Sequence, residues 1–116
     1  MHGTDLVVYT KDSRTVLTDR IKEGHALACA DFFGQGRDQV VMGWRNPNVT
    51  GETGLRIYVG SDAEGKKWTE YTLDEKIKIA CEDLLPADLD GDGDLDIIAS
   101  GRATHNLVVY WNQRKK

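Results

Sequence analysis

The chain lacks the features that mark several protein classes. None of its 116 residues belongs to an apolar run approaching the ~18 positions of a transmembrane helix, so membrane insertion is not expected. A net charge of −4 gives no electrostatic case for binding nucleic acid, and the basic tail from Arg114 onward is expected to be a solvated end. Residues 1–5 lack the charged start and apolar core of a secretory signal. The two cysteines, Cys29 and Cys81, are most simply free buried thiols, since sequence does not show whether they face each other.

The strongest motif is an alternation of acidic residues within a short glycine-containing segment. Aspartate occupies every second position at Asp88, Asp90, Asp92, Asp94 and Asp96. These charges would repel one another in a compact structure, while the glycines between them let the backbone bend sharply. A hard cation offsets that repulsion, and Ca²⁺ is the usual choice because it accepts about six to eight oxygen ligands in flexible geometry. We therefore expect a Ca²⁺ loop that uses four side chains and the backbone carbonyl of Asp94; the alternative is a solvated acidic turn.

The flanking residues place this loop between strands. An EF-hand loop ends in a bidentate glutamate, whereas Ala99 stands at the corresponding position here. Pro86 argues against a helix entering the loop, and the apolar run after Asp96 is too short to form a helix. The expected structure is a metal loop that joins two β-strands.

A weaker copy of the motif lies 57 residues upstream. Residues 30–41 align with residues 87–98 without a gap, and both glycines fall in register. Asp31 is kept, but three other ligand positions are occupied by Phe33, Gln35 and Gln39. One carboxylate holds Ca²⁺ poorly, so we expect this copy to keep the turn without the ion, with Arg37 and polar groups in its place.

A short strand pattern that ends in tyrosine occurs three times, at residues 6–9, 55–58 and 107–110. After each copy of the loop the order is the same: a strand, a polar turn and the tyrosine-ended strand. Nine strands are predicted, at residues 5–10, 15–18, 26–31, 39–44, 55–59, 68–73, 79–87, 96–100 and 107–111. Repeats of about 40–60 residues built from four strands are typical of β-propeller blades, so the predicted fold class is all-β.

The acidic loop followed by two aliphatic residues, at positions 88–98, resembles the FG-GAP or VCBS repeats of integrin-alpha-like β-propellers. The resemblance covers nearly the whole chain and implies blades of four antiparallel strands, with Ca²⁺ in the loop between the first two strands. It also implies an extracellular or exported location. More loosely, residues 24–27 and 101–106 resemble the propeller of proteins similar to aldos-2-ulose dehydratase.

Mapped onto blades, the chain divides into three parts. Residues 1–22 would form the outer strands of a partial blade, residues 23–75 a blade with a degenerate metal loop, and residues 76–116 a blade with the intact calcium loop. About two blades cannot close a propeller, which needs about four to eight, and open edges favour association. We therefore expect three or four copies to complete a closed propeller as a homo-oligomer. The alternative is a piece of a longer propeller or a designed segment.

A second group of candidate residues would lie near the central channel. By the 57-residue register, His25 corresponds to Glu82, which Asp83 follows, and Arg45 corresponds to Arg102, with His105 shortly after. Histidines and carboxylates can bind a metal or act as acid and base in eliminating water from a sugar. The candidate catalytic residues are His25, Glu82, Asp83 and His105. The simpler interpretation is arginine–acid pairs between blades and a hydrogen-bonded histidine.

Two functions therefore stay open. One is a calcium-binding structural or binding scaffold; the other is a fragment of a carbohydrate-active enzyme, similar to a sugar dehydratase or lyase, with its site on the channel. Convergence of the four candidate residues on one cavity would favour the enzyme. Integrin-like adhesion has only a shared fold behind it, and a fold does not carry a function.

Overall fold

The computed structural model describes residues 3–45, 53–73 and 78–114. This part of the chain is all-β and includes no helix that could cross a membrane. Its nine strands are β1 (Leu6–Tyr9), β2 (Arg14–Thr18), β3 (Gly24–Ala30), β4 (Gln39–Trp44), β5 (Gly54–Gly60), β6 (Trp68–Thr72), β7 (Cys81–Ala87), β8 (Asp96–Gly101) and β9 (Asn106–Tyr110). Every predicted strand is confirmed, with ends that shift by one or two residues.

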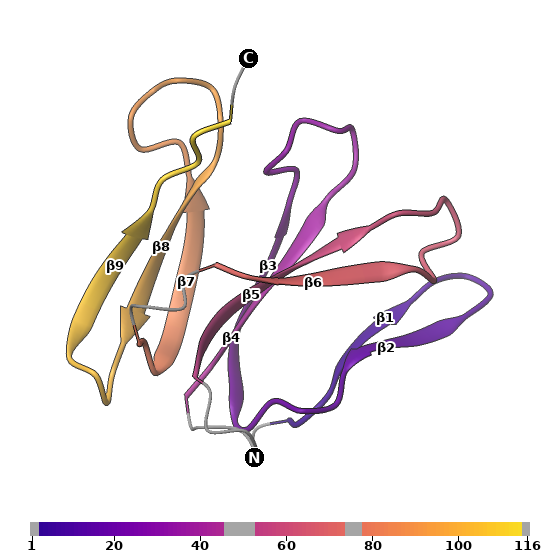
Figure 1. Cartoon of the computed structure of the whole chain (residues 1–116), viewed down its shortest axis with the longest axis horizontal. Helices are drawn as coiled ribbons and strands as arrows, with labels where there is room; N and C mark the ends of the chain where they lie inside the picture. Colours follow the sequence, from indigo (N-terminus) through magenta and orange to yellow (C-terminus); the bar gives the residue numbers. More distant parts are fainter. Residues whose placement is uncertain (1–2, 46–52, 74–77, 115–116) are drawn as a thin grey trace.

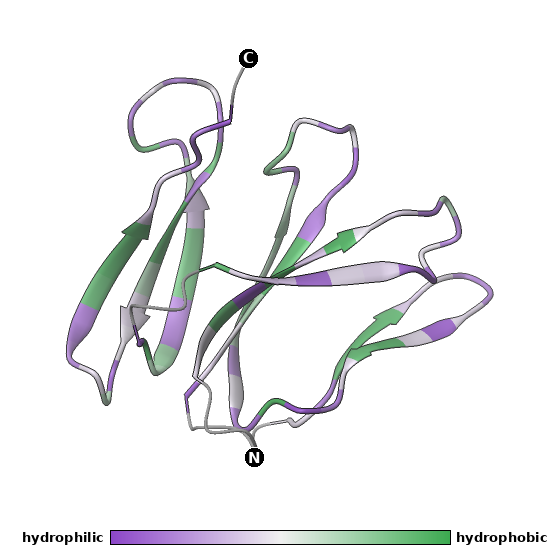
Figure 2. Ribbon diagram, viewed as in Figure 1, coloured by the Kyte–Doolittle hydropathy of each residue, from purple (hydrophilic) through white to green (hydrophobic). Residues whose placement is uncertain are grey.

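The strands form three antiparallel sheets in which chain neighbours pair (Figure 1). The hairpin β1–β2 is followed by the four-stranded sheet β3-β4-β5-β6 and then by the three-stranded sheet β7-β8-β9. The loops β3–β4 and β7–β8 occupy equivalent places in their sheets and lie at the same end of the molecule. Hydrophobic residues follow the strands of all three sheets, and hydrophilic residues gather in the turns (Figure 2).

Strand β7 begins at Cys81, and the prediction that it begins at Ile79 is wrong. The backbone of Ala80 pairs with the turn after β8: its N–H donates to Thr104 Oγ1 over 3.2 Å, and its carbonyl accepts from the Arg102 N–H over 3.3 Å. Ile79 is nevertheless fully buried. Its apolar character predicted burial correctly, whereas the pairing of the neighbouring backbone depends on a turn that is distant in sequence.

The four-stranded sheet is covered on both faces. Strand β4 is buried along its whole length, and successive residues point to opposite sides. Val41 packs in a cluster with residues of β7 and β8, whereas Val40 and Met42 pack in a second cluster with Leu6 of the hairpin. The first cluster comprises Ala26, Phe32, Val41, Leu55, Ile57, Ile79, Cys81, Leu84, Ile97 and Ala99. The second comprises Leu6, Ile21, Val40, Met42, Trp44 and Tyr58.

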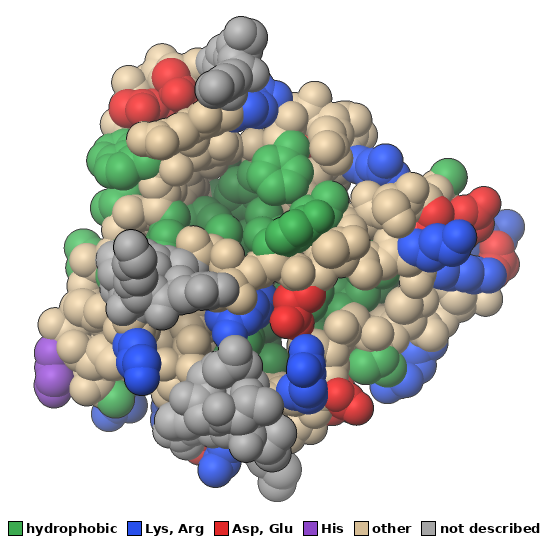
Figure 3. Space-filling model, in the orientation of Figure 1, with side chains coloured by type: hydrophobic (Ala, Val, Ile, Leu, Met, Phe, Trp, Pro, Cys, Tyr) green, Lys and Arg blue, Asp and Glu red, His purple; other side chains and the backbone are tan. Residues whose placement is uncertain are grey.

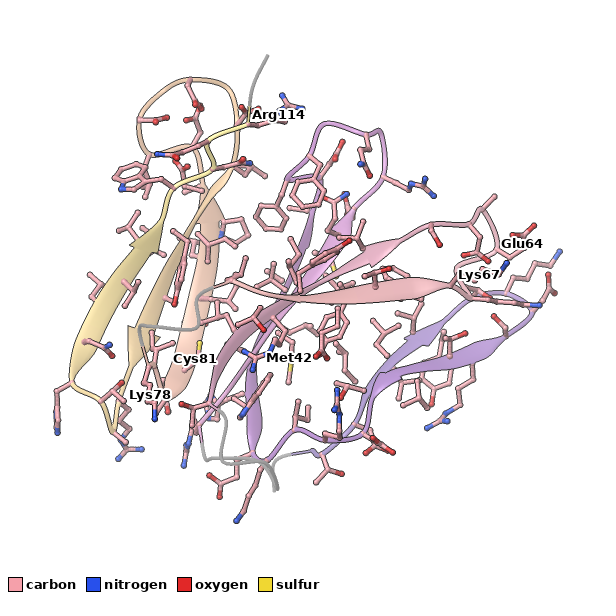
Figure 4. All side chains as sticks on the ribbon, in the orientation of Figure 1. Met42, Glu64, Lys67, Lys78, Cys81 and Arg114 are labelled. Atoms are coloured by element: carbon pink, nitrogen blue, oxygen red, sulfur yellow. The ribbon has the colours of Figure 1, made fainter. Side chains whose placement is uncertain are left out.

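The closest approach between sheets is at Gly43. A Cβ at this position would lie 2.5 Å from Cys81 Sγ and 2.7 Å from Cys81 Cβ, so glycine makes room for β7 against β4. Burial, with the charges of Asp83 and Glu82 as further causes, raises the pKa of the Cys81 thiol to about 12 (Figure 4). Both cysteines are free. Cys81 is buried, as the sequence predicts, whereas Cys29 is exposed and the prediction that it is buried is wrong.

We expect Gly43→Ala to lower the free energy of unfolding by about 1–3 kcal/mol, because the added methyl group overpacks a tight contact. Gly60→Ala is the matched control on the neighbouring strand β5, since the atoms nearest its added Cβ, those of Trp68, would lie at 3.5 Å or more. Urea titration of both variants checks this. Equal stabilities for the two alanine variants would contradict the packing described at Gly43.

Candidate metal centre

The acidic loop between β7 and β8 curls around Asp88. Gly91 and Gly93 have φ of 76° and 92°, in the left-handed region that favours glycine. These bends turn backbone N–H groups inward, so that Asp88 Oδ1 accepts from Gly91 N over 2.9 Å and Oδ2 from Gly93 N over 3.0 Å. The local sequence therefore fixes the bend before any cation is considered.

Three carboxylates of this loop converge. Asp88, Asp90 and Asp96 each offer one oxygen, and these oxygens lie within 4.8 Å of one another. Asp96 is fully buried, where Oδ2 accepts from Leu89 N over 3.0 Å. Desolvation, with the charges of Asp92 and Asp96 as further causes, raises the pKa of Asp90. The donor set consists of hard oxygens that repel one another, which fits a cation such as Ca²⁺.

The two remaining aspartates of the loop have different positions. Asp92 Oδ1 accepts a hydrogen bond from Asp94 N over 2.9 Å at the exposed side of the loop. The Asp94 side chain is buried and forms an ion pair with Arg114. The Asp94 carboxylate is therefore engaged by Arg114, and a metal role for the Asp94 backbone carbonyl stays a prediction.

The upstream copy, at residues 31–39, has the same bend. Gly34 and Gly36 have φ of 63° and 79°, and the Asp31 carboxylate accepts from Gln35 N over 2.9 Å and from Gly36 N over 2.8 Å. Those hydrogen bonds, the Gln35 N–H first, lower the pKa of Asp31 from its ordinary 3.8. The two loops therefore share one backbone design.

Gln39 fills the centre of the upstream loop, where it replaces Asp96. It is fully buried; its Oε1 accepts from Phe33 N over 3.2 Å and its Nε2 donates to the Arg37 carbonyl over 2.8 Å. That carbonyl is the repeat equivalent of the Asp94 carbonyl, the expected metal ligand. The expectation that the Arg37 side chain would replace the ion is wrong, because this exposed side chain donates to the Asp62 carbonyl over 3.4 Å.

The segment after β9 ties the two loops together. Asn112 N donates to Asp96 Oδ1 over 2.8 Å, and Asn112 Nδ2 donates to the Phe32 carbonyl over 2.7 Å. Arg114 donates to the Phe33 carbonyl over 2.7 Å and pairs with Asp94 (Figure 4). Arg114 is exposed, as the sequence predicts for a solvated end, but its side chain is held by these two contacts; Lys115 and Lys116 lie outside the described residues. The charge of Arg114 predicts exposure. No local sequence signal indicates that the segment after β9 places Arg114 against both the upstream and the downstream loop.

An apolar cavity of about 380 Å³ lies beside this segment, between the two larger sheets. Phe33, Ile57, Leu73, Tyr110 and Trp111 are among the residues that line it. Figure 3 shows apolar side chains gathered in the hollow at this place.

The candidate channel residues converge only in part. Glu82 is held by His25 and Arg45: His25 Nδ1 lies 2.6 Å from the Glu82 carbonyl, and its Nε2 and Arg45 Nη1 lie 3.6 Å and 3.5 Å from the carboxylate. Glu82 and His105 line one cavity of about 470 Å³ with Arg45 and Arg102. Asp83 lines a different cavity, beside Leu107 on the opposite face of β7–β9.

Comparison with known proteins assigns a family. A family model described as an FG-GAP-like repeat matches residues 31–99, more than half of the chain. The match begins at the upstream loop and continues past the acidic loop. Neither the curated proteins nor the solved structures contain a match to the chain.

We expect Arg114→Ala to lower the free energy of unfolding by about 1–3 kcal/mol, because it removes the charged partner of the buried Asp94 carboxylate. Arg37→Ala is the control, an exposed arginine of the upstream loop whose loss should change stability by no more than about 0.5 kcal/mol. Chemical denaturation measures both. Similar small losses would show that the C-terminal segment does not hold the loops.

The lowered pKa of Asp31 predicts an acid-sensitive contribution from the upstream loop. A folded pKa below the unfolded value adds stability that is fully present above 3.8 and is lost as the pH falls through the lowered folded pKa. Asp31→Asn should therefore flatten the decline of the melting temperature in that range. An NMR-titrated Asp31 pKa at or above 3.8 would contradict the hydrogen bonds described.

Proposed function

This chain belongs to the FG-GAP-like repeat family, and we propose that it is a calcium-binding, β-propeller-like repeat module in which the ion has a structural role. The proposal assigns Ca²⁺ to the loop between β7 and β8. Asp88, Asp90, Asp92 and Asp96 would hold it with side-chain oxygens, and Asp94 with its backbone carbonyl.

The observation that carries this proposal is the contrast between the two loops. Both have the same left-handed glycines and the same leading aspartate. In the upstream loop a neutral amide, that of Gln39, donates to the Arg37 carbonyl. In the downstream loop Asp96 takes that position, and an ionised carboxylate has no hydrogen to donate. A cation supplies the positive partner that the amide supplies in the other copy.

The chemistry of the donor set favours Ca²⁺ over other ions. The converging atoms are carboxylate oxygens, with no cysteine or histidine in the loop. Oxygen-only sets suit hard cations, and a curled backbone loop offers the flexible geometry that Ca²⁺ accepts and Mg²⁺ does not. If the protein is exported, as the family resemblance implies, millimolar external calcium would fill even a weak site.

A structural role follows from where the loop lies. Asp96 connects through Asn112 to the Phe32 carbonyl in the loop β3–β4 of the neighbouring sheet. An ion that holds Asp96 and Asp94 would also hold the segment that joins the two sheets. Binding energy would then appear as stability of the folded state.

As a module the chain is proposed to associate with itself. Three or four copies would complete a closed propeller, because within the described residues the hairpin and the sheet β7–β9 each leave one face uncovered. The carbohydrate-enzyme alternative receives less support. Glu82 is already paired with His25 and Arg45, and Asp83 lies on another face. The looser similarity to the dehydratase propellers therefore adds no candidate reaction.

Asp90→Ala and Asp92→Ala should abolish the stabilisation that Ca²⁺ gives, which is about 2.7 kcal/mol when the free ion is a hundredfold above its dissociation constant. Without the ion, each substitution should lower the melting temperature much less, because it then removes only one hydrogen bond from a backbone N–H of the loop. Thermal unfolding with Ca²⁺ and with excess chelator measures this. Equal losses in both conditions would contradict a metal role for these residues.

The matched control is Gln39→Ala in the upstream loop. It leaves the Phe33 N–H and the Arg37 carbonyl without the side-chain partner seen here, and should cost about 1–3 kcal/mol. Because no ion is proposed there, the loss should be the same with calcium and with chelator. Calorimetric titration should then give one Ca²⁺ per chain for this variant and none for Asp90→Ala.

A further inference from the structure

One face of the sheet β7–β9 has no cover among the described residues. Leu85 is 60% exposed and Leu107 is 70% exposed, with Ile98 and Val109 half-buried beside them. We call these four residues the open face. They lie on adjacent strands of one sheet, and a contiguous apolar patch on a sheet marks a contact surface.

The repeat shows what kind of surface the open face is. In β8–β9 the cross-strand partners are Ile98↔Val109 and Ser100↔Leu107. The same positions of the four-stranded sheet are Val41↔Ile57 and Gly43↔Leu55. Leu55 and Val41 are 2% and 0% exposed because the sheet β7–β9 packs over them. The open face therefore repeats a face that receives another sheet.

The hairpin β1–β2 offers the complementary surface. Tyr58 lies in the cluster beneath the hairpin, and Tyr110 packs against the core between the two larger sheets. Their repeat equivalent Tyr9 is 72% exposed, next to Val7 and the 44% exposed Val16. We call Val7, Tyr9 and Val16 the rear face of the hairpin. It is the side that faces the preceding sheet in the other two repeats.

One chain cannot join these two faces to each other. The sheet β7–β9 and the hairpin lie at opposite sides of the molecule, with the four-stranded sheet between them (Figure 1). Leu6 and the hairpin's other side are already packed on the four-stranded sheet. The rear face is thus directed outward, as is the open face.

We propose that the open face binds the rear face of the hairpin of a second copy, in a head-to-tail contact. The inference rests on the proposed self-association and names its surface: sheets stack face to face, as they do within the chain. Because the two faces differ, each bound copy keeps one of them free, and the contact repeats until a ring closes or a filament grows.

The test uses two blocking variants of the full chain, Leu107→Arg on the open face and Val16→Arg on the rear face. Each alone should have the mass of a single chain, 13.0 kDa, in light scattering with Ca²⁺ present. Mixed in equal amounts, they should form a dimer and nothing larger, because one variant keeps a working rear face and the other a working open face. Tyr71→Arg, at a residue of β6 outside both faces whose exposure of 54% lies between those of Val16 and Leu107, should keep the mass of the unsubstituted chain.

The outcomes separate this inference from the proposed function. An oligomer that survives both blocking variants would overturn the head-to-tail contact and leave self-association standing. A single-chain mass for the unsubstituted protein would overturn both. Blocked variants that do not pair on mixing would also overturn the contact, provided that their circular dichroism and calcium binding match those of the unsubstituted chain.

Discussion

The burial of both faces of β4 is the constraint on which the rest of the structure depends. Its alternate residues supply two separate apolar clusters, so the central sheet needs a sheet on each side. The hairpin and the sheet β7–β9 each satisfy that need with one face. Within the part of the chain that the structure describes, each of them keeps its other face uncovered, and this asymmetry gives the molecule two unlike ends. The contact proposed between copies repeats this face-to-face packing of sheets between two molecules.

The two loops show one backbone bend with two electrostatic solutions. Left-handed glycines and a leading aspartate build the bend in both, with hydrogen bonds that need no ion. The difference lies at the centre, where Gln39 provides both a donor and an acceptor and Asp96 provides acceptors alone. On the proposed calcium assignment, the upstream copy keeps the shape of the loop without an ion because the Gln39 amide supplies the hydrogen-bond donor.

The C-terminal segment joins these two themes. Asn112 and Arg114 contact carbonyl groups of the upstream loop and carboxylates of the downstream loop. The same short segment therefore places a positive charge beside the acidic loop and links the two larger sheets. The ion pairs around Glu82 at the other end of β7 are longer and partly exposed, and such pairs contribute little stability.

The sequence by itself determined the all-β class, the nine strands and the acidic loop, because alternation, turn residues and the spacing of aspartates act over a few residues. It also determined that the upstream loop keeps its bend, since the paired glycines are local signals. Only the tertiary structure decided that Gln39 and not Arg37 fills that loop, that Arg114 is held by two loops, that β7 begins at Cys81, and that Asp83 lies apart from Glu82. The first three depend on contacts between segments that are distant in sequence. The last depends on the irregularity of β7 between Cys81 and Asp83, which changes the direction of the side chains there. Side-chain direction and long-range pairing come from how the sheets stack, and no short pattern encodes that.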